Sequence, residues 1–163
     1  MEFKNHCNEF LPEDVTNAVK NADLEKINTF SIEQLNGDSN LYMGSGRPLI
    51  FDSLSGFNSC EVLKCMIDKG TNVNCVDTGI PNKSLLMAAV KNSYFDQIKI
   101  IVDAGANLNF IPDWHDGDYP QSIIGTALFY KRYQIVDFLQ EKGAKYLEKE
   151  EEIIKDFNSK YKY

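Results

Sequence analysis

Four cysteines and two histidines are the residues of this 163-residue chain that could bind a metal or form disulfides. Cys7, Cys60, Cys65 and Cys75 are separated by 53, 5 and 10 positions. These spacings match neither a zinc knuckle nor the disulfide framework of a small secreted domain. We therefore expect reduced thiols, no structural metal and no cofactor.

Catalysis needs a nucleophile or an acid–base pair held within reach of an orienting group. The sequence has no nucleophile elbow, no zinc-protease motif, no phosphate-binding loop and no dinucleotide fingerprint. Its acidic residues are numerous but scattered, as on a solvated surface. The sequence therefore favours a protein that is not an enzyme.

One segment, Phe110 to Gln121, combines aromatic and acidic side chains (FIPDWHDGDYPQ) between two prolines. Large aromatic side chains dominate protein interfaces, and prolines reduce the entropy lost on binding. Three interpretations stay open: a partner-binding loop, rings that fold back onto Phe129 and Tyr130 in a small local core, or a disordered segment. The candidate partner-binding residues of the segment are Asp113, Trp114, Asp116, Asp118 and Tyr119.

The charge balance limits the class of partner. With 17 basic and 24 acidic residues the formal net charge is −7, which disfavours nucleic acid and favours a protein partner with a basic surface. No apolar run is long enough to span a membrane, and the polar first ten residues do not resemble a signal peptide. We expect a cytoplasmic protein that is monomeric apart from its partner.

A repeated sequence pattern runs through the helices that are expected to position the candidate binding residues. The phrases EVLKCMIDKGTNVN, DQIKIIVDAGANLN and QIVDFLQEKGAK each contain a helix-closing glycine, and Gly70, Gly105 and Gly143 are 35 and 38 positions apart. A glycine ends a helix readily because it adopts the left-handed conformation at little cost.

Each closing helix carries apolar residues on one predicted face, and each is preceded by a shorter helix with a large–small–large pattern. The predicted faces are Cys60, Leu63, Met66 and Ile67; Phe95, Ile98, Ile101 and Val102; and Tyr133, Val136, Leu139 and Gln140. The small residues of the shorter helices, which allow close helix packing, are Ala18, Ser53, Ala89 and Ala127.

These patterns predict one domain over residues 1–163, with helix pairs at 13–36, 48–74, 84–109 and 122–145. A further helix at 146–163 is expected to cap the last pair, the alternative being a mobile charged tail. The connection from Asn36 to Arg47 is rich in glycine and serine, and we expect it to be flexible, with a second, weaker contact site as one interpretation.

The repeated phrases resemble the ankyrin repeat family. The family's closing element is kept as GTNVN from Gly70 and GANLN from Gly105, and its opening element is partly kept at Pro48 and at Ala88-Ala89. The resemblance implies an all-α solenoid of about four helix-pair repeats that binds proteins. It also implies binding through inter-repeat loops and through two positions at the end of each first helix: Lys20 and Asn21, Ser55 and Gly56, Lys91 and Asn92, and Phe129 and Tyr130.

Two roles for such a module remain open. One is an inhibitor or immunity-type protein that sequesters a basic toxin or enzyme. The other is an adaptor or host-interaction effector that bridges two proteins, which would require two separate binding surfaces.

Overall fold

The computed structural model describes residues 13–42, 45–56, 58–79, 82–112, 122–148 and 150. The described chain is mostly helical with a small strand content, as the predicted all-α class requires. It divides into two compact units, Met1–Asn72 and Val73–Tyr163. None of the described helices is both long and apolar enough to cross a bilayer.

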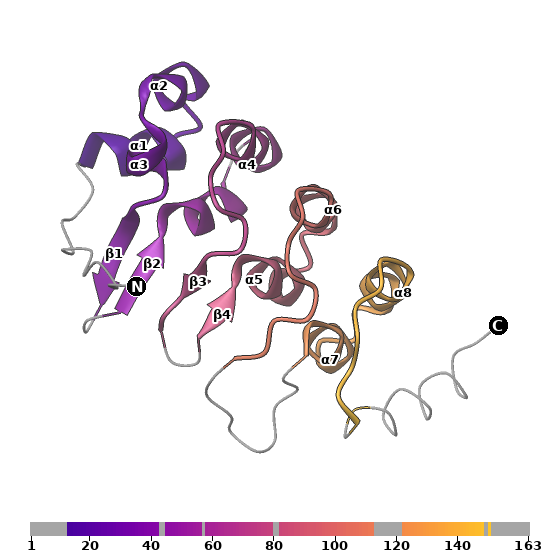
Figure 1. Cartoon of the computed structure of the whole chain (residues 1–163). Helices are drawn as coiled ribbons and strands as arrows, with labels where there is room; N and C mark the ends of the chain where they lie inside the picture. Colours follow the sequence, from indigo (N-terminus) through magenta and orange to yellow (C-terminus); the bar gives the residue numbers. More distant parts are fainter. Residues whose placement is uncertain are drawn as a thin grey trace. The chain divides into compact units, whose positions relative to one another are not determined.

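The first unit contains two layers of helices (Figure 1). Helix α1 (Glu13–Lys20) packs against η1 (Leu49–Leu54), and α2 (Leu24–Thr29) packs against α4 (Ser59–Asp68). A short helix, α3 (Ile32–Leu35), follows α2 and begins with a capping box at Ser31. The helix expected from Pro48 is a 3-10 helix, and the Ser53 hydroxyl within it donates to the Ile50 carbonyl oxygen at 2.6 Å.

The predicted small residues of this unit lie in its core. Ala18 and Ser53 are buried, and so are the large residues beside them, Val15, Ile50 and Leu54. A small side chain at the contact allows neighbouring helices to approach closely, so the large residues on either side interdigitate. The large–small–large pattern is confirmed in this unit.

The expectation of a flexible connection between Asn36 and Arg47 is wrong in most of its length. Strands β1 (Asp38–Tyr42) and β2 (Ser45–Pro48) form an antiparallel pair with an irregularity between Asp38 and Asn40. The Leu49 N–H then donates to the Gly37 carbonyl oxygen at 2.9 Å, which joins the hairpin to η1. Strand pairing uses backbone N–H and C=O groups, which every one of these residue types provides. The glycine and serine content of the segment therefore gave no sign of the strand pair.

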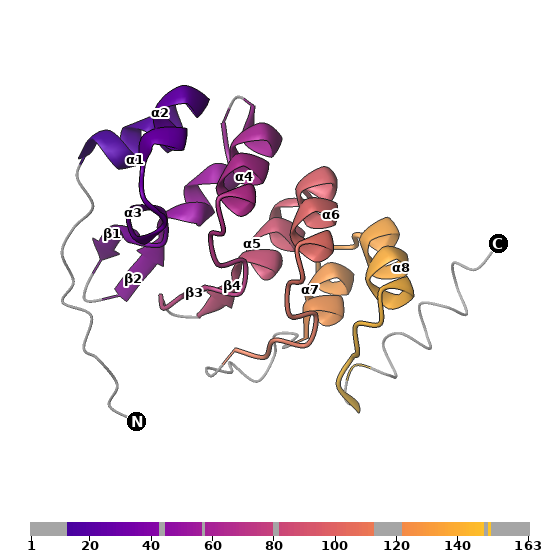
Figure 2. The ribbon, with the colours of Figure 1, turned by 45° about the horizontal axis from the view of Figure 1, so that its top comes forward.

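The second unit also contains two layers (Figure 2). Helices α5 (Leu85–Asn92) and α7 (Ile123–Phe129) pack against each other, and they carry α6 (Phe95–Asp103) and α8 (Tyr133–Glu141), respectively. Strands β3 (Val76–Asp77) and β4 (Lys83–Ser84) form a short antiparallel pair before α5. Serine hydroxyls cap the first helices, because Ser84 accepts from the Met87 N–H and Ser122 from the Gly125 N–H.

The buried face of each second helix is rotated from the predicted one. Leu63, Met66, Ile98, Ile101, Val136 and Leu139 are buried as expected, but Cys60, Ile67, Phe95, Val102 and Tyr133 are only half-buried and Gln140 is exposed. The face is completed instead by Val62, Gln97 and Ile135. A spacing of i, i+1 and i+4 centres the buried face about a third of a turn from Cys60, Phe95 and Tyr133, which leaves these residues at its rim.

A left-handed residue ends nearly every helix of both layers. Gly70, Gly105 and Gly143 have φ of 94°, 86° and 90°, so the predicted glycine caps are confirmed. The same conformation occurs without glycine at the ends of α1, α5 and α7, where φ is 55°, 60° and 54° at Ala22, Ser93 and Lys131. At each of these six turns the left-handed residue and its successor donate backbone hydrogen bonds into the last helical turn.

Asparagine side chains join successive loops within each unit. In the first unit Asn36 Oδ1 accepts from the Asn72 N–H at 2.9 Å. In the second, Asn74 Oδ1 accepts from the Asn107 N–H at 2.6 Å, and Asn109 Oδ1 accepts from the Lys145 N–H at 2.8 Å. The closing asparagines of the repeat therefore provide acceptors for backbone N–H groups of the following repeat.

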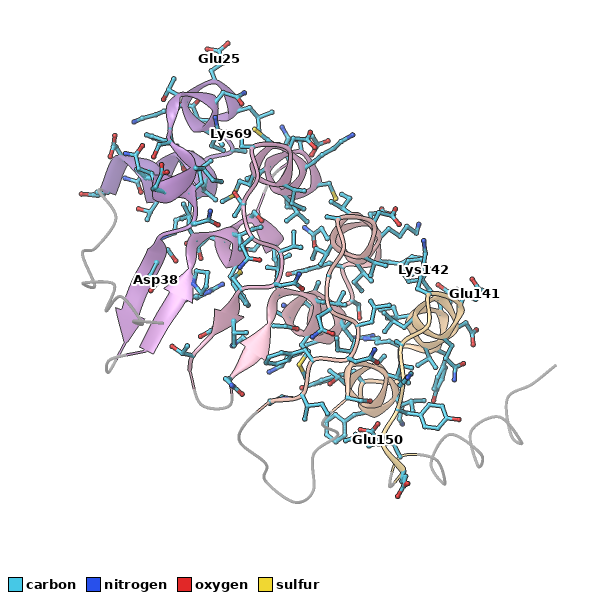
Figure 3. The ribbon with its side chains drawn as sticks, viewed as in Figure 1. Glu25, Asp38, Lys69, Glu141, Lys142 and Glu150 are labelled. Carbon is cyan, nitrogen blue, oxygen red and sulfur yellow. The ribbon has the colours of Figure 1, made fainter. Side chains whose placement is uncertain are left out.

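Most of the expected capping helix at 146–163 lies outside the described residues. Glu150, which is described, is buried with 3% of its surface exposed (labelled in Figure 3). Its carboxylate accepts from the N–H and the hydroxyl of Ser122 and from the Leu147 N–H. Glu150 thus links the last described segment to the first residue before α7.

Exchanging glycine and alanine at left-handed positions should change stability in opposite directions. Gly105→Ala should lower the free energy of unfolding by about 1 kcal/mol. An added Cβ would meet nothing within 4 Å there, so backbone strain is the only cost. Ala22→Gly should be neutral or stabilising by up to about 1 kcal/mol, since it removes strain but adds chain entropy to the unfolded state. Urea titration measures both, and equal effects of the same sign would contradict this explanation.

Removing the Glu150 carboxylate should destabilise the second unit. Glu150→Ala should cost about 2 kcal/mol or more in unfolding free energy, because three donors lose a buried charged acceptor. Glu148→Ala is the matched control, since Glu148 is exposed and should change stability by less than about 0.5 kcal/mol. Equal melting temperatures for the two variants would show that Glu150 contributes no such link.

Candidate functional site

Two aromatic rings project from the end of α7. Residues Ile123 to Leu128 are buried, and the helix ends at Phe129, whose side chain is the most exposed of the large apolar residues described, at 48%. The Phe129 and Tyr130 rings meet edge to face, with centroids 5.2 Å apart and an interplanar angle of 84°. The structure therefore brings together the aromatic pair that the sequence predicts as a partner-binding site.

The neighbouring helix places two polar residues at the corresponding positions. Lys91 and Asn92 form the last turn of α5, and both side chains are exposed. Because α5 packs directly against α7, the ends of these two helices supply four of the predicted site residues. We call Lys91, Asn92, Phe129 and Tyr130, with the two residues described next, the helix-end surface.

Sequence reasoning missed two residues of this surface. Lys131 and Arg132 form the turn between α7 and α8, and both are exposed. Their N–H groups donate to the carbonyl oxygens of Leu128 and Ala127 at 2.8 Å each, so the backbone of the turn is held in place. The signal was present in the sequence as an uninterrupted aromatic–basic run, FYKR.

The other predicted site residues cannot be placed on this surface. Asp113, Trp114, Asp116, Asp118 and Tyr119 lie outside the described residues. All three interpretations of the segment therefore stay predictions. Just before it, Ile111 is 45% exposed and Pro112 is buried.

The equivalent positions of the first unit are polar or small, and the one charged residue among them, Lys20, lies near a carboxylate. The Lys20 ammonium lies 4.0 Å from a carboxylate oxygen of Asp52, and the Arg47 guanidinium lies 3.5 Å from the other. Asn21, Ser55 and Gly56 are exposed. This part of the predicted site offers hydrogen-bonding groups but no exposed large apolar side chain.

A second aromatic pair, in the other helical layer, is covered by its own cations. Phe95 of α6 and Phe138 of α8 meet edge to face at 5.6 Å. Lys99 lies over the Phe95 ring at 4.4 Å and Lys142 over the Phe138 ring at 5.5 Å. Lys142, labelled in Figure 3, also pairs with Asp103 at 3.1 Å. Both rings are half-buried, which distinguishes them from Phe129.

Among the described residues, the two ionisable groups with shifted pKa values belong to the first unit. Burial raises the pKa of the half-buried Cys65 thiol, which donates to Asn28 Oδ1 at 3.6 Å. Hydrogen bonds from its own backbone N–H and the Ser31 hydroxyl lower the pKa of Glu33. Among the residues that the structure describes, no three His, Cys, Asp or Glu side chains gather in a way that could hold a metal ion.

Comparison with known proteins gives a partial relationship. The chain is 40% identical over 86 residues to a protein of Acanthamoeba polyphaga mimivirus described as an ankyrin repeat protein. The match covers 53% of this chain but only 21% of the viral protein, so the chain spans about a fifth of its relative. No family model matches the sequence. The resemblance seen in the repeated phrases is supported over this matched part.

The raised pKa of Cys65 predicts slow alkylation. A raised pKa means that the thiol keeps its proton at neutral pH, and only the thiolate reacts with iodoacetamide. The pH of half-maximal alkylation of Cys65 should lie above the ordinary thiol value of about 8.5 and return to that value in urea. Peptide mass spectrometry after timed alkylation measures this. A half-maximal pH below 8.5 in the folded protein would indicate a stabilised thiolate, contrary to this account.

Proposed function

We propose that this chain is an ankyrin-type protein-binding module that engages one protein partner through its helix-end surface. Three lines support the proposal: the repeated helix pairs, the partial identity with an ankyrin repeat protein, and the composition of the surface itself. Ankyrin-type repeats form extended surfaces from equivalent positions on stacked units.

The observation that carries the proposal is the exposure of Phe129. A phenylalanine with 48% of its surface exposed is costly to solvate, and burying it against a partner would recover that free energy. It lies against Tyr130, and aromatic pairs with polar neighbours are typical of interface hot spots. Within the part of the chain that the structure describes, no three His, Cys, Asp or Glu side chains form a comparable cluster.

Sequestration of a single protein fits the described surface better than bridging. The exposed large apolar residues described are Ile111, Phe129 and Tyr146, and all three belong to the second unit. An adaptor would need a second exposed apolar surface. We therefore favour an inhibitor or immunity-type role in the cytoplasm, with an adaptor or effector as the second candidate.

The binding role is tested by comparing affinity and stability in the same variants, using a partner captured from the native source and purified. Phe129→Ala should raise the dissociation constant about thirtyfold or more, the hot-spot scale of 2 kcal/mol, and change the melting temperature little. Calorimetry gives the first quantity and thermal unfolding the second.

Phe138→Ala is the matched control. Its ring is half-buried against Phe95 in the other layer, so the variant should lose stability and keep its affinity. If Phe129→Ala instead lowers the melting temperature and leaves the affinity unchanged, the aromatic pair serves the fold, and the proposed surface is wrong.

A further inference from the structure

The helix-end surface carries a concentration of positive charge on an acidic chain. Lys91 lies in the last turn of α5, and Lys131 and Arg132 directly follow the aromatic pair at the end of α7. All three side chains are exposed, whereas the chain as a whole has a formal charge of −7. The helix-end surface, which carries the exposed Phe129 ring, is therefore locally positive although the chain as a whole is negative.

Several other cations of the molecule form ion pairs, and among the described residues these three do not. Lys20 and Arg47 share Asp52, Lys83 pairs with Asp77 at 3.0 Å, and Lys99 and Lys142 pair with neighbouring aspartates. Within the described part of the chain, Lys91, Lys131 and Arg132 form no ion pair. Their charges remain available to a partner.

The turn geometry explains why the charges stay beside the rings. Lys131 has φ of 54°, a left-handed conformation that is unfavourable for a residue with a Cβ. Its N–H and that of Arg132 nevertheless close the end of α7. A backbone held in this way fixes where the side chains start and lowers the entropy lost when they bind.

We propose that the helix-end surface binds an acidic segment of its protein partner, one in which carboxylates flank an apolar or aromatic side chain. Arg132 can hold a carboxylate through two N–H groups, and Lys91 and Lys131 supply point charges. The apolar side chain would lie against Phe129 and Tyr130. This inference deepens the proposed function and rests on it. It assigns an acidic contact segment to the partner, whereas Asp113, Asp116 and Asp118 led us to expect a basic partner surface.

A protein segment fits these features better than nucleic acid does. Three cations on a chain of net charge −7 neutralise few phosphates, and repulsion from the remaining acidic surface opposes an extended polyanion. A short acidic peptide needs only a local match of charge and an apolar contact, both of which this surface provides.

The test is a selection from a display library of random dodecapeptides on the folded, full-length chain. Peptides enriched by the wild-type protein should carry a net negative charge and an aromatic or aliphatic residue. A triple variant, Lys91→Glu, Lys131→Glu and Arg132→Glu, should enrich basic peptides instead. Lys64→Glu, which reverses an exposed charge on α4, is the control and should enrich the wild-type set.

Synthetic versions of the enriched peptides are then titrated by fluorescence anisotropy, beside a twelve-nucleotide single-stranded DNA. Wild-type binding to the acidic peptide should be at least tenfold tighter than to the DNA and should weaken tenfold or more in the triple variant. Neutral or basic enriched peptides, no enrichment over the input library, or DNA binding of equal strength would each overturn the inference. In those cases an affinity loss for the purified partner in Phe129→Ala would still support the proposed function, so the two can fail separately.

Discussion

The described fold depends on one backbone constraint, which is that a helix must end within a residue or two so that the chain can reverse. The same solution occurs at α1, α5 and α7 and at the glycines after α4, α6 and α8. A residue in the left-handed conformation, and the residue after it, donate N–H groups into the last helical turn. The short reversals bring each helix of a pair against its partner, and small residues such as Ala89 and Ala127 allow the close contact.

That constraint also determines the candidate site. Because α7 ends abruptly, Phe129 and Tyr130 stand at its end instead of continuing a buried face, and Lys131 and Arg132 occupy the turn itself. Lys91 and Asn92 lie in the last turn of α5, the helix that packs against α7. The acceptors of Asn74 and Asn109 hold the loops at the other end of the repeats. The proposed binding surface is therefore a consequence of where α5 and α7 end.

Sequence reasoning predicted the parts of this architecture that side-chain type encodes. The glycine caps and the small contact residues were readable because each needs a particular residue type or spacing. The positions of Phe129 and Tyr130 came from the resemblance to the ankyrin repeat family. The β1–β2 pair was not, since backbone hydrogen bonds leave no side-chain pattern. Left-handed Ala22 and Ser93 carry no residue-type signal, and the Glu150–Ser122 contact joins residues 28 positions apart. Lys131 and Arg132 were readable but lay just outside the positions that the resemblance implied.

The central claim is that the ends of α5 and α7 form the contact surface for a protein partner. Hydrogen–deuterium exchange of the chain, alone and saturated with its purified native partner, tests this most directly. We expect slower exchange in peptides that cover residues 88–94 and 127–132, with little change in peptides from α4, α6 or α8. Protection confined to those helices, with the α5 and α7 ends unchanged, would contradict it.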